Sequence, residues 1–298
     1  MKINNKIRVN KKYKIAGLGE LLWDVQDNNK TLGGAPANFA FHCQKLGAQA
    51  YVISSLGNDE MGQKARNTLS QHGINIDGLD LSLQYTSGLV NIELDRKGKP
   101  LYNIVENVAW DYIPFSHKMK EIAPKLDAVC FGTLAQRNHR SRESIKKFLE
   151  STSRDCLRVF DINIRQSYYS REVILSSLSR SNVLKVSDEE LPLLAGILKI
   201  NGPQTNQLKK IFMKFNLKLA ILTCGSRGAY MLTTEEESFV KPPRLKNIVS
   251  TVGAGDSFMA AVIMGYLGKN KLAKINKDGH TLAAKVCSQK GAITDYIR

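Results

Sequence analysis

The sequence predicts an α/β protein in which helices flank a mostly parallel central β-sheet and a small β-sheet is added. Three observations predict this class. Short apolar runs alternate along the chain with segments of helical periodicity, which is typical of parallel strands joined by crossover helices. One stretch instead alternates like a β-hairpin. The length of 298 residues, 43% of them hydrophobic, suits a single domain with a substantial core.

The order of the elements follows from caps and periodicity. A strand is predicted at residues 14–20, and the next helix begins within residues 32–38, with Pro36 in its first turn and Gly47 as its stop. Later strands are predicted at residues 51–54, 128–131, 158–161, 183–186 and 219–223. Helices are predicted between them at residues 61–71, 141–151, 189–198 and 207–215.

The segment that breaks this pattern is residues 87–94, where Val90 and Ile92 alternate with their neighbours. The turn formed by residues 95–98 then leads into residues 101–106. This is a β-hairpin inside an α/β protein. An ordinary edge hairpin is one interpretation of it.

A small-residue turn near the C-terminus, Gly253-Ala254-Gly255-Asp256, runs into the apolar stretch 259–267. Glycines let backbone N–H groups converge, and the helix that follows adds the positive end of its dipole, so the turn favours an anionic oxygen. Asp256 can then act as the base that accepts the proton of an attacking hydroxyl. The alternative is that the turn is scaffolding before a buried helix.

A second glycine-led helix start, Gly33-Gly34-Ala35-Pro36-Ala37-Asn38, suggests a second ligand group. The helix is apolar over most of its circumference, which predicts that it is buried. Asn38 is a polar residue in this mostly apolar helix, and a buried amide needs hydrogen-bond partners. One turn into the helix it can face whatever lies beyond the strand ends. A core asparagine satisfied by the protein is the alternative.

Together these motifs resemble the PfkB, or ribokinase-like, family of carbohydrate kinases, and its fructokinases most of all. The N-terminal signature continues with Leu46-Gly47 and residues 57–62, and the C-terminal one reads Thr-Val-Gly-Ala-Gly-Asp-Ser-Phe at residues 251–258. Between them, in the family's order, come residues 132–137, 161–165, 184–190 and 222–228. The resemblance covers nearly the whole length. It implies one ribokinase-like kinase domain over residues 1–298, with lid segments at about 21–31 and 85–110 that close over a sugar and exclude water.

The resemblance also implies a role for individual residues. Asp256 is the base and Gly253, Ala254 and Gly255 form the anion hole. Substrate-binding residues are Asp24, Gly33, Gly34, Asn38, Arg137 and Arg165, with Arg165 near the transferred phosphate. ATP-binding residues are Lys185, Thr223, Gly225, Gly228 and Ser288, with Ala284, Cys287 and Gly291 also near the adenine, while Glu190 acts on magnesium through water. A loop aspartate at Asp24 and a surface ion pair at Arg165 are the alternatives.

Two positions depart from the family pattern. Ser187 stands where the family usually has asparagine in its magnesium segment, and Ser250 stands where it usually has aspartate. Loss of the amide at Ser187 would weaken the magnesium–water network. Loss of the carboxylate at Ser250 puts the monovalent-cation site of many relatives in doubt. The base, the anion hole and Glu190 are all retained.

Composition excludes several other classes of function. The net charge is +16, but the lysines are spread out and lack interleaved aromatic residues, so we expect a solvated surface and no nucleic acid. The five cysteines and five histidines are scattered, which argues against a zinc site or a disulfide framework and favours a reducing cytoplasm. No segment is long enough to cross a membrane. Neither a Gly-x-x-x-x-Gly-Lys phosphate loop nor a dinucleotide fingerprint occurs.

The sequence therefore predicts an ATP-dependent sugar kinase that transfers the γ-phosphoryl group of Mg-ATP to a primary hydroxyl of a small sugar, with D-fructose as the leading substrate. Asp24 and Asn38 can pair with adjacent hydroxyls, and Val90, Ile92 and Trp110 can cover a neutral hexose. Another sugar, a pentose, a nucleoside or the sugar acid 2-keto-3-deoxygluconate is the alternative, the acid being supported by Arg137. A catalytically silent sensor is the third reading. The family resemblance adds a homodimer through the lid as a possible assembly.

Overall fold

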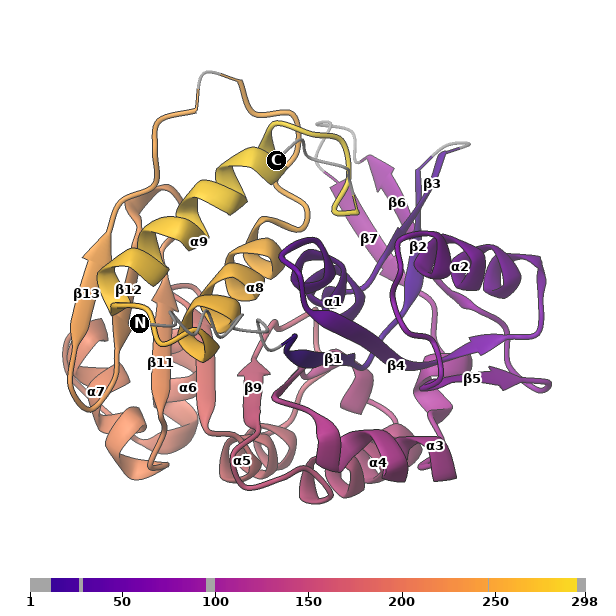
Figure 1. Ribbon diagram of the computed structural model, residues 1–298, viewed down its shortest axis with the longest axis horizontal. Coiled ribbons are helices and arrows are strands. Elements are labelled where there is room, and N and C mark those ends of the chain that lie inside the picture. The colour runs from indigo at the N-terminus through magenta and orange to yellow at the C-terminus, as the bar shows by residue number, and fades with distance from the viewer. Residues whose placement is uncertain (1–11, 27–28, 95–99, 246, 294–298) are drawn as a thin grey trace, which may run out of the picture.

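The computed structural model describes residues 12–26, 29–94, 100–245 and 247–293. They form three layers, with a large sheet between two layers of helices and a small sheet at one end (Figure 1). The strands are β1 (Lys14–Leu18), β2 (Leu22–Gln26), β3 (Asn29–Gly33), β4 (Gln49–Gly57), β5 (Leu79–Ser82), β6 (Gly88–Leu94), β7 (Pro100–Ile104), β8 (Ala128–Phe131), β9 (Leu157–Asp161), β10 (Val183–Ser187), β11 (Leu219–Thr223), β12 (Ala229–Leu232) and β13 (Glu237–Val240). The helices are α1 (Ala35–Lys45), α2 (Glu60–Gln71), α3 (His117–Ile122), α4 (His139–Glu150), α5 (Arg171–Arg180), α6 (Leu191–Leu198), α7 (Gln204–Lys214), α8 (Ala254–Leu267) and α9 (Leu272–Cys287).

The large sheet confirms the predicted parallel architecture. Within the described ranges its strand order is β13-β12-β11-β10-β9-β8-β1-β4-β5. Seven neighbouring strands of this sheet, β5, β4, β1, β8, β9, β10 and β11, pair in parallel. Strands β12 and β13 add an antiparallel edge. The chain leaves β1 toward β4 and later returns to β8 on the other side of β1. The strand order therefore reverses between β1 and β8, and open α/β sheets bind ligands at the carboxyl ends of their strands at such a point.

The alternation of side chains along the strands divides the core into two faces. Cys130 and Val159 point to the face covered by α1, α8 and α9, where they join Phe258. Their neighbours Phe131 and Phe160 point to the face covered by α3 to α7. Figure 1 shows these two helix layers on opposite sides of the sheet. Strands buried on both faces explain the continuous apolar runs of the sequence.

The small sheet has the strand order β3-β2-β6-β7, in which β2 pairs antiparallel with β3 and parallel with β6. The predicted hairpin is present as β6 and β7, and its expected turn at residues 95–98 lies outside the described residues. The expected lid segment to residue 110 extends further than these strands. Residues 109–112 form a short 3-10 helix whose Trp110 is fully buried in the large core.

Several elements were missing from the sequence prediction, and α9 shows why. Gly279 stands in the middle of this helix, where glycine normally argues against one. A Cβ atom at Gly279 would lie 2.9 Å from the Phe258 ring of α8, so the glycine permits the close contact of the two helices. Pairwise partners of this kind, and the edge strands β5, β12 and β13, are not visible in local periodicity.

Helix starts also differ slightly from the predicted positions. Helix α6 begins at Leu191 and not at residue 189, because residues 188–190 form the turn before it. Helix α2 begins one residue earlier than predicted, since the Asp59 side chain accepts a hydrogen bond from the N–H of Gly62 and caps it. No helix of the described ranges combines the length and apolarity needed to span a bilayer.

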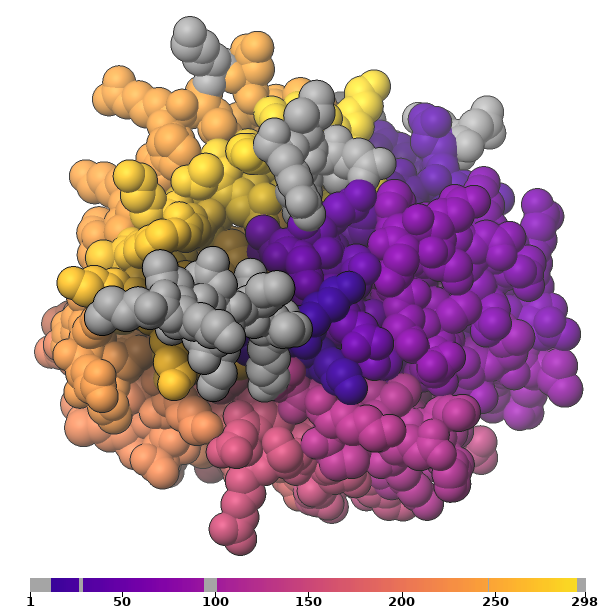
Figure 2. Space-filling model, viewed as in Figure 1, coloured from indigo at the N-terminus to yellow at the C-terminus, as the bar shows by residue number. Residues whose placement is uncertain are grey.

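The first and last parts of the chain lie side by side. Helix α1 packs against α8, and α8 against α9. On the face seen in Figure 2, the purple segments of the N-terminal part lie directly beside the yellow C-terminal ones. The two glycine-led helix starts, 219 residues apart if counted from Gly34 to Gly253, are thereby brought to the same end of the sheet.

Candidate active site

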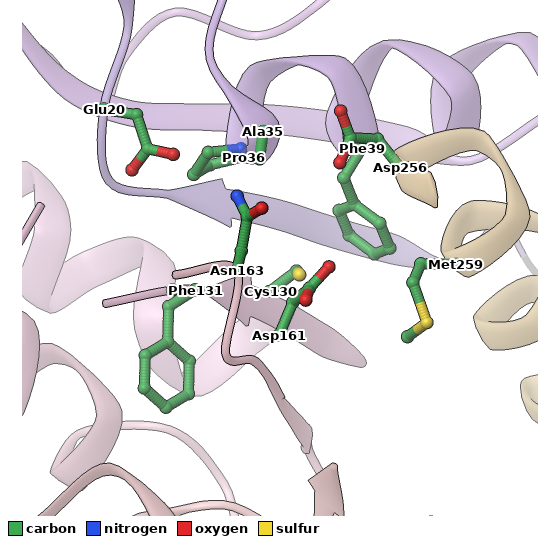
Figure 3. A pocket seen from close by; sticks show the side chains of 11 residues that line it. Glu20, Ala35, Pro36, Phe39, Cys130, Phe131, Asp161, Asn163, Asp256 and Met259 are labelled. Atoms are coloured by element: carbon green, nitrogen blue, oxygen red, sulfur yellow. The ribbon is translucent and has the colours of Figure 1, made fainter. Parts of the chain in front are cut away.

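A small cavity opens at the carboxyl ends of the strands, at the point where the strand order reverses. Glu20 follows β1, Asp161 ends β9, Asn163 follows it and Asp256 lies in the first turn of α8. Figure 3 shows these side chains around the cavity, with Phe39 of α1 and Met259 of α8 also lining it. Three carboxyl groups from three separate elements therefore meet in one place.

Asp256 is half-buried and its carboxylate is tied to the other glycine-led helix. Asn38 Nδ2 of α1 donates a hydrogen bond of 2.8 Å to Asp256 Oδ2. Burial raises the pKa of Asp256 to about 6, although the hydrogen bond from Asn38 acts against this rise. A carboxyl group with a pKa nearer neutrality is a stronger base than an ordinary aspartate and is still largely ionised at pH 7.

The turn before Asp256 has the geometry of an anion site. Gly253 has φ 78°, and a Cβ atom on it would lie 2.5 Å from Cβ of Ala292, so other residues are excluded. The N–H of Ala254 donates to the carbonyl of Thr251. In the described part of the chain no hydrogen-bond partner is found for the N–H groups of Gly255 and Asp256, and they stand at the positive end of the helix dipole.

The two glycines before α1 stand where a side chain would come too close to neighbouring atoms. Gly34 has φ 110°, and a Cβ atom there would lie 2.3 Å from the carbonyl oxygen of Glu20. A Cβ atom on Gly33 would lie 3.0 Å from Oδ2 of Asp24. Asn38 is 5% exposed and its Oδ1 has no hydrogen-bond partner among the described residues. That unpaired acceptor is a feature expected of a ligand-binding amide.

Asp24 and Arg165 lie near one another on the open side of the site. Burial raises the pKa of Asp24 to about 6, and the positive charge of Arg165 opposes this rise. Arg165 is exposed, and its Nη1 donates a hydrogen bond of 3.1 Å to the carbonyl of the neighbouring Ile164. Its charge also acts on Glu20 and Asp256. Among the described residues Arg165 has no ion pair, so the expected alternative of a surface ion pair finds no partner.

Lys185 and Glu190 form the next part of the site. Lys185 is 8% exposed and its Nζ lies 2.9 Å from Asp161 Oδ1. Glu190 accepts hydrogen bonds from the N–H groups of Ile164 (2.9 Å) and Ser187 (2.8 Å). Burial alone would raise the pKa of Glu190, but Lys185 and these two N–H groups lower it below its ordinary range. The hydroxyl of Ser187 accepts a hydrogen bond from the N–H of Glu190 and so stabilises the turn at residues 188–190.

The donor set limits how a divalent metal can be held. No group of three or more His, Cys, Asp or Glu side chains capable of holding a metal ion occurs within the described ranges. An ionised Glu190 with free lone pairs fits contact through metal-bound water, which is the usual manner of Mg²⁺ beside nucleotide phosphates.

Arg137 was expected to bind the substrate, but its guanidinium makes several hydrogen bonds within the protein. Its Nε and Nη2 donate to the two carboxylate oxygens of Asp111 at 2.7 and 2.8 Å, and Nη2 also donates to the carbonyl of Val105. The guanidinium lies between the rings of Trp110 and Tyr168. Its Nη1 is buried and has no hydrogen-bond partner among the described residues. The positive charge is therefore already neutralised by Asp111.

The expected nucleotide residues lie at the same edge of the sheet, beyond β10. Thr223 ends β11, and Gly225 and Gly228 follow with φ 54° and 123°. A Cβ atom on Gly228 would lie 2.4 Å from the carbonyl oxygen of Val240. Ser288 caps α9 at its exposed C-terminal end. These residues are removed from the carboxyl groups but share the strand-end edge with them.

Sequence reasoning missed two residues at the centre of the site. Glu20 entered only as the last residue of the predicted strand 14–20, and Asp161 only as the first residue of the family segment 161–165. Their available signal was a carboxylate at the end of a buried strand, where strand ends of a parallel sheet meet. Asp111, the partner of Arg137, gave no comparable signal.

The chain is similar to known carbohydrate kinases. A profile described as pfkB family carbohydrate kinase matches residues 3–297. An uncharacterised sugar kinase of Pyrococcus horikoshii, PH1459, is 28% identical over 93% of this chain and 91% of that protein. An ATP-dependent 6-phosphofructokinase of Thermoanaerobacterium thermosaccharolyticum is 27% identical over 96% of this chain and 91% of its own length. A fructokinase of Solanum tuberosum is 27% identical over 78% of this chain and 71% of its own length.

Solved structures share the fold. PH1459 in complex with ATP has a TM-score of 0.81 at 26% identity, covering 94% of each chain. Fructokinase of Xylella fastidiosa with bound ATP has a TM-score of 0.85 at 18% identity, covering 95% of this chain and 94% of its own. The expected ribokinase-like α/β fold is confirmed by these likenesses. Because the family profile matches residues 3–297, nearly the full length, the chain belongs to the pfkB family of carbohydrate kinases.

Proposed function

We propose that this carbohydrate kinase transfers the γ-phosphoryl group of Mg-ATP to a primary hydroxyl of a neutral hexose, with D-fructose as the preferred substrate. The observation that carries the proposal is the hydrogen bond from Asn38 to Asp256. It joins the two glycine-led helix starts and supports Asp256 as a base beside the proposed anion site of α8. This is the pairing of base and phosphate position that phosphoryl transfer needs.

In this proposal Asp256 accepts the proton of the sugar hydroxyl while that oxygen bonds to the γ-phosphorus. The bond from the γ-phosphorus to the bridging oxygen breaks, and ADP leaves with its electron pair. The free N–H groups of Gly255 and Asp256 and the exposed guanidinium of Arg165 stabilise the negative charge that develops on the phosphoryl oxygens. Mg²⁺ would be held between the ATP phosphates and water ordered by Glu190, and it supplies charge neutralisation there. Lys185, Thr223, Gly225, Gly228 and Ser288 bind the nucleotide. The binding of ATP by PH1459, whose structure contains it, supports this assignment.

The preference for a neutral sugar rests on Arg137. A sugar acid needs an unpaired cation at its carboxylate end, and Asp111 already occupies the Nε and Nη2 donors of Arg137. Asp24, Gly33, Gly34 and Asn38 remain for hydroxyl groups, and Asn38 keeps one buried unpaired acceptor. The fructokinases among the relatives support fructose itself, and the 6-phosphofructokinase makes fructose 6-phosphate the competitor to test.

The test is an ADP-release assay over fructose, fructose 6-phosphate, ribose, 2-keto-3-deoxygluconate and adenosine. We expect kcat/KM for fructose to exceed each of the others by about tenfold or more, which corresponds to about 1.4 kcal/mol in transition-state binding. If 2-keto-3-deoxygluconate is best and Arg137→Ala removes that preference, the sugar assignment is wrong and the kinase assignment stands. Sugar and ATP binding without any ADP release would identify a silent sensor instead.

A further inference from the structure

Glu20 is a buried carboxyl group for which the proposed reaction has no direct use. It is 3% exposed, and its Oε2 is buried without a hydrogen-bond partner among the described residues. An ionised carboxylate in such a place is costly unless a positive charge or hydrogen-bond donors compensate it. The group must therefore find compensation or take up a proton.

Glu20 shares its cavity with two other carboxyl groups, which are better compensated. Asp161 is paired with the ammonium of Lys185 at 2.9 Å. Asp256 accepts a hydrogen bond from Asn38 and lies in the first turn of α8, where the helix dipole favours negative charge. Figure 3 shows Glu20 on the opposite side of the cavity from Asp256, beside Ala35 and Pro36. When several like charges share a buried site, the least compensated one takes the proton.

The groups that face Glu20 from neighbouring elements leave it the least compensated of the three carboxyl groups. Asp256 faces it from α8, Arg165 from the segment after β9, and the backbone N–H of Ala35 from the start of α1. Burial raises the pKa of Glu20 to about 7, and Arg165 and the backbone N–H groups only reduce that rise. The pKa of Asp256 is about 6. As the pH falls, Glu20 therefore takes up a proton before Asp256 does.

Two further titratable groups surround the cavity and remain in one state near neutral pH. Burial holds the pKa of the Cys130 thiol well above its ordinary value. Burial acts to lower the pKa of Lys185, but Asp161 and Glu190 outweigh it and raise that pKa above its ordinary value. The thiol stays neutral and the ammonium stays charged. Burial also raises the pKa of Asp161, but the ammonium of Lys185 acts against that rise, and Glu20 has no such partner at hydrogen-bond distance among the described residues.

We propose that Glu20 keeps its proton up to the neutral pH range, over which Asp256 is already ionised, and thereby leaves Asp256 as the base beside a neutral carboxyl group. In this proposal Glu20 acts through the charge of Asp256 and is therefore a positioning residue. A neutral Glu20 keeps a second negative charge away from the phosphoryl oxygens at the start of α8. The inference rests on the phosphoryl transfer proposed above.

The consequence is a two-sided pH dependence. Asp256 must be ionised to accept a proton, so kcat falls as the pH drops through its pKa. Glu20 must be neutral, so kcat falls again as the pH rises and Glu20 loses its proton. The two apparent pKa values belong to the pair and not to single residues, because the carboxyl groups interact.

The decisive variant is Glu20→Gln, which has the shape of a glutamic acid side chain but cannot ionise. At saturating substrates, wild-type kcat should fall by about tenfold or more between its optimum and pH 8.5, since Glu20 is then mostly ionised. In the variant this alkaline fall should disappear and the acidic fall should remain. Cys130→Ala, which alters a titratable group of the same cavity, should keep both. A persistent alkaline fall in Glu20→Gln, or its absence in the wild type, would overturn the proposal.

A second measurement needs no turnover and separates this inference from the proposed function. Carbon-13 NMR of protein labelled at the glutamate carboxyl carbon should show one signal that titrates near pH 7, far above the ordinary value of about 4.3. Among the described residues the other glutamates with a displaced pKa, Glu190 and Glu237, are shifted in the opposite direction. If every glutamate signal titrates below about pH 5.5, Glu20 is ionised at neutral pH and the proposal fails, whether or not the protein is a kinase.

Discussion

At the scale of single residues, the hydrogen-bond and ion-pair partners of a charged side chain determine whether its charge is available to a ligand. Arg137 and Asp111 neutralise one another in a buried, bidentate pair, and Lys185 does the same for Asp161. Arg165 is left with an exposed guanidinium and no ion pair in the described part of the chain. Asp256 accepts one hydrogen bond, from the amide of Asn38, and the proposed function uses it as the base. Residues of the same chemical type thus divide into those paired with an opposite charge and those without such a pair in the described part of the chain.

The first prediction tests Asp256. Asp256→Asn retains a side-chain oxygen that can accept the Asn38 hydrogen bond, so the fold and the affinity for ATP should be kept. Without the base, kcat should fall by about two orders of magnitude or more. ADP release measures kcat, and calorimetry measures ATP binding. Asp278→Asn removes an equal charge from the surface of α9 and should leave kcat unchanged. Near-normal turnover in Asp256→Asn would contradict the assignment.

At the scale of elements, the turn before α8 is built from glycine geometry and from ties to α9. Gly253 is required because of the close approach of Ala292. The N–H of Ser250 donates to the carbonyl of Cys287, and its hydroxyl accepts from the N–H of Val252 at 3.2 Å. Ser250 therefore satisfies the backbone of the turn. It brings no negative charge to the position where the family usually has aspartate.

The second prediction follows from that missing charge. Without that carboxylate the position offers one oxygen ligand and one negative charge fewer to a cation, so replacing sodium by potassium at constant ionic strength should change kcat little. Ser250→Asp should introduce or enhance potassium activation, by about twofold or more. Ser250→Asn matches the size of that change without the charge and should show no response. Strong potassium activation of the unmodified protein would mean that backbone carbonyls alone hold the ion.

At the scale of the whole molecule, the segment after β9 connects the small sheet to the large one. Gln166 Nε2 donates to the carbonyl of Tyr102 in β7 at 2.6 Å, and the hydroxyl of Tyr168 donates to Glu106 Oε1 at 2.7 Å. The C-terminal segment adds a contact on the other side, since a Cβ atom on Gly291 would lie 3.2 Å from Thr31 of β3. The expected lid is thus held at both edges by parts of the molecule that also border the site.

The third prediction tests this connection through Tyr168→Phe. Loss of one hydrogen bond is worth about 1 kcal/mol, so KM for the sugar should rise about fivefold, and more ATP should be hydrolysed per sugar phosphate formed. Tyr169→Phe changes the neighbouring ring, whose hydroxyl makes no side-chain hydrogen bond in the described ranges, and should leave both quantities unchanged. Equal behaviour of the two variants would show that the connection does not affect closure. The expected homodimer through the lid stays a prediction, which light scattering can test.

The sequence by itself determined the features that depend on neighbouring residues. Apolar runs of strand length, capped helices and the glycine turns at Gly34 and Gly253 act over a few residues, so their elements and the family membership could be predicted. The predicted segments at 128–131 and 219–223 coincide with β8 and β11. The same local rules misjudged α9, because Gly279 is needed for a contact with a distant helix.

The tertiary structure alone decided which charges are paired and which carboxyl group is isolated. Asp111 reaches Arg137 across 26 positions of the chain, and Asn38 reaches Asp256 across 218. No local pattern encodes such pairings. Burial and compensation arise only when β1, β9 and α8 converge, and they separate Glu20 from Asp256 although both are carboxylates at the end or start of an element. The chemistry of the site therefore depends on long-range packing, because the free energy of a charge is set by everything that surrounds it.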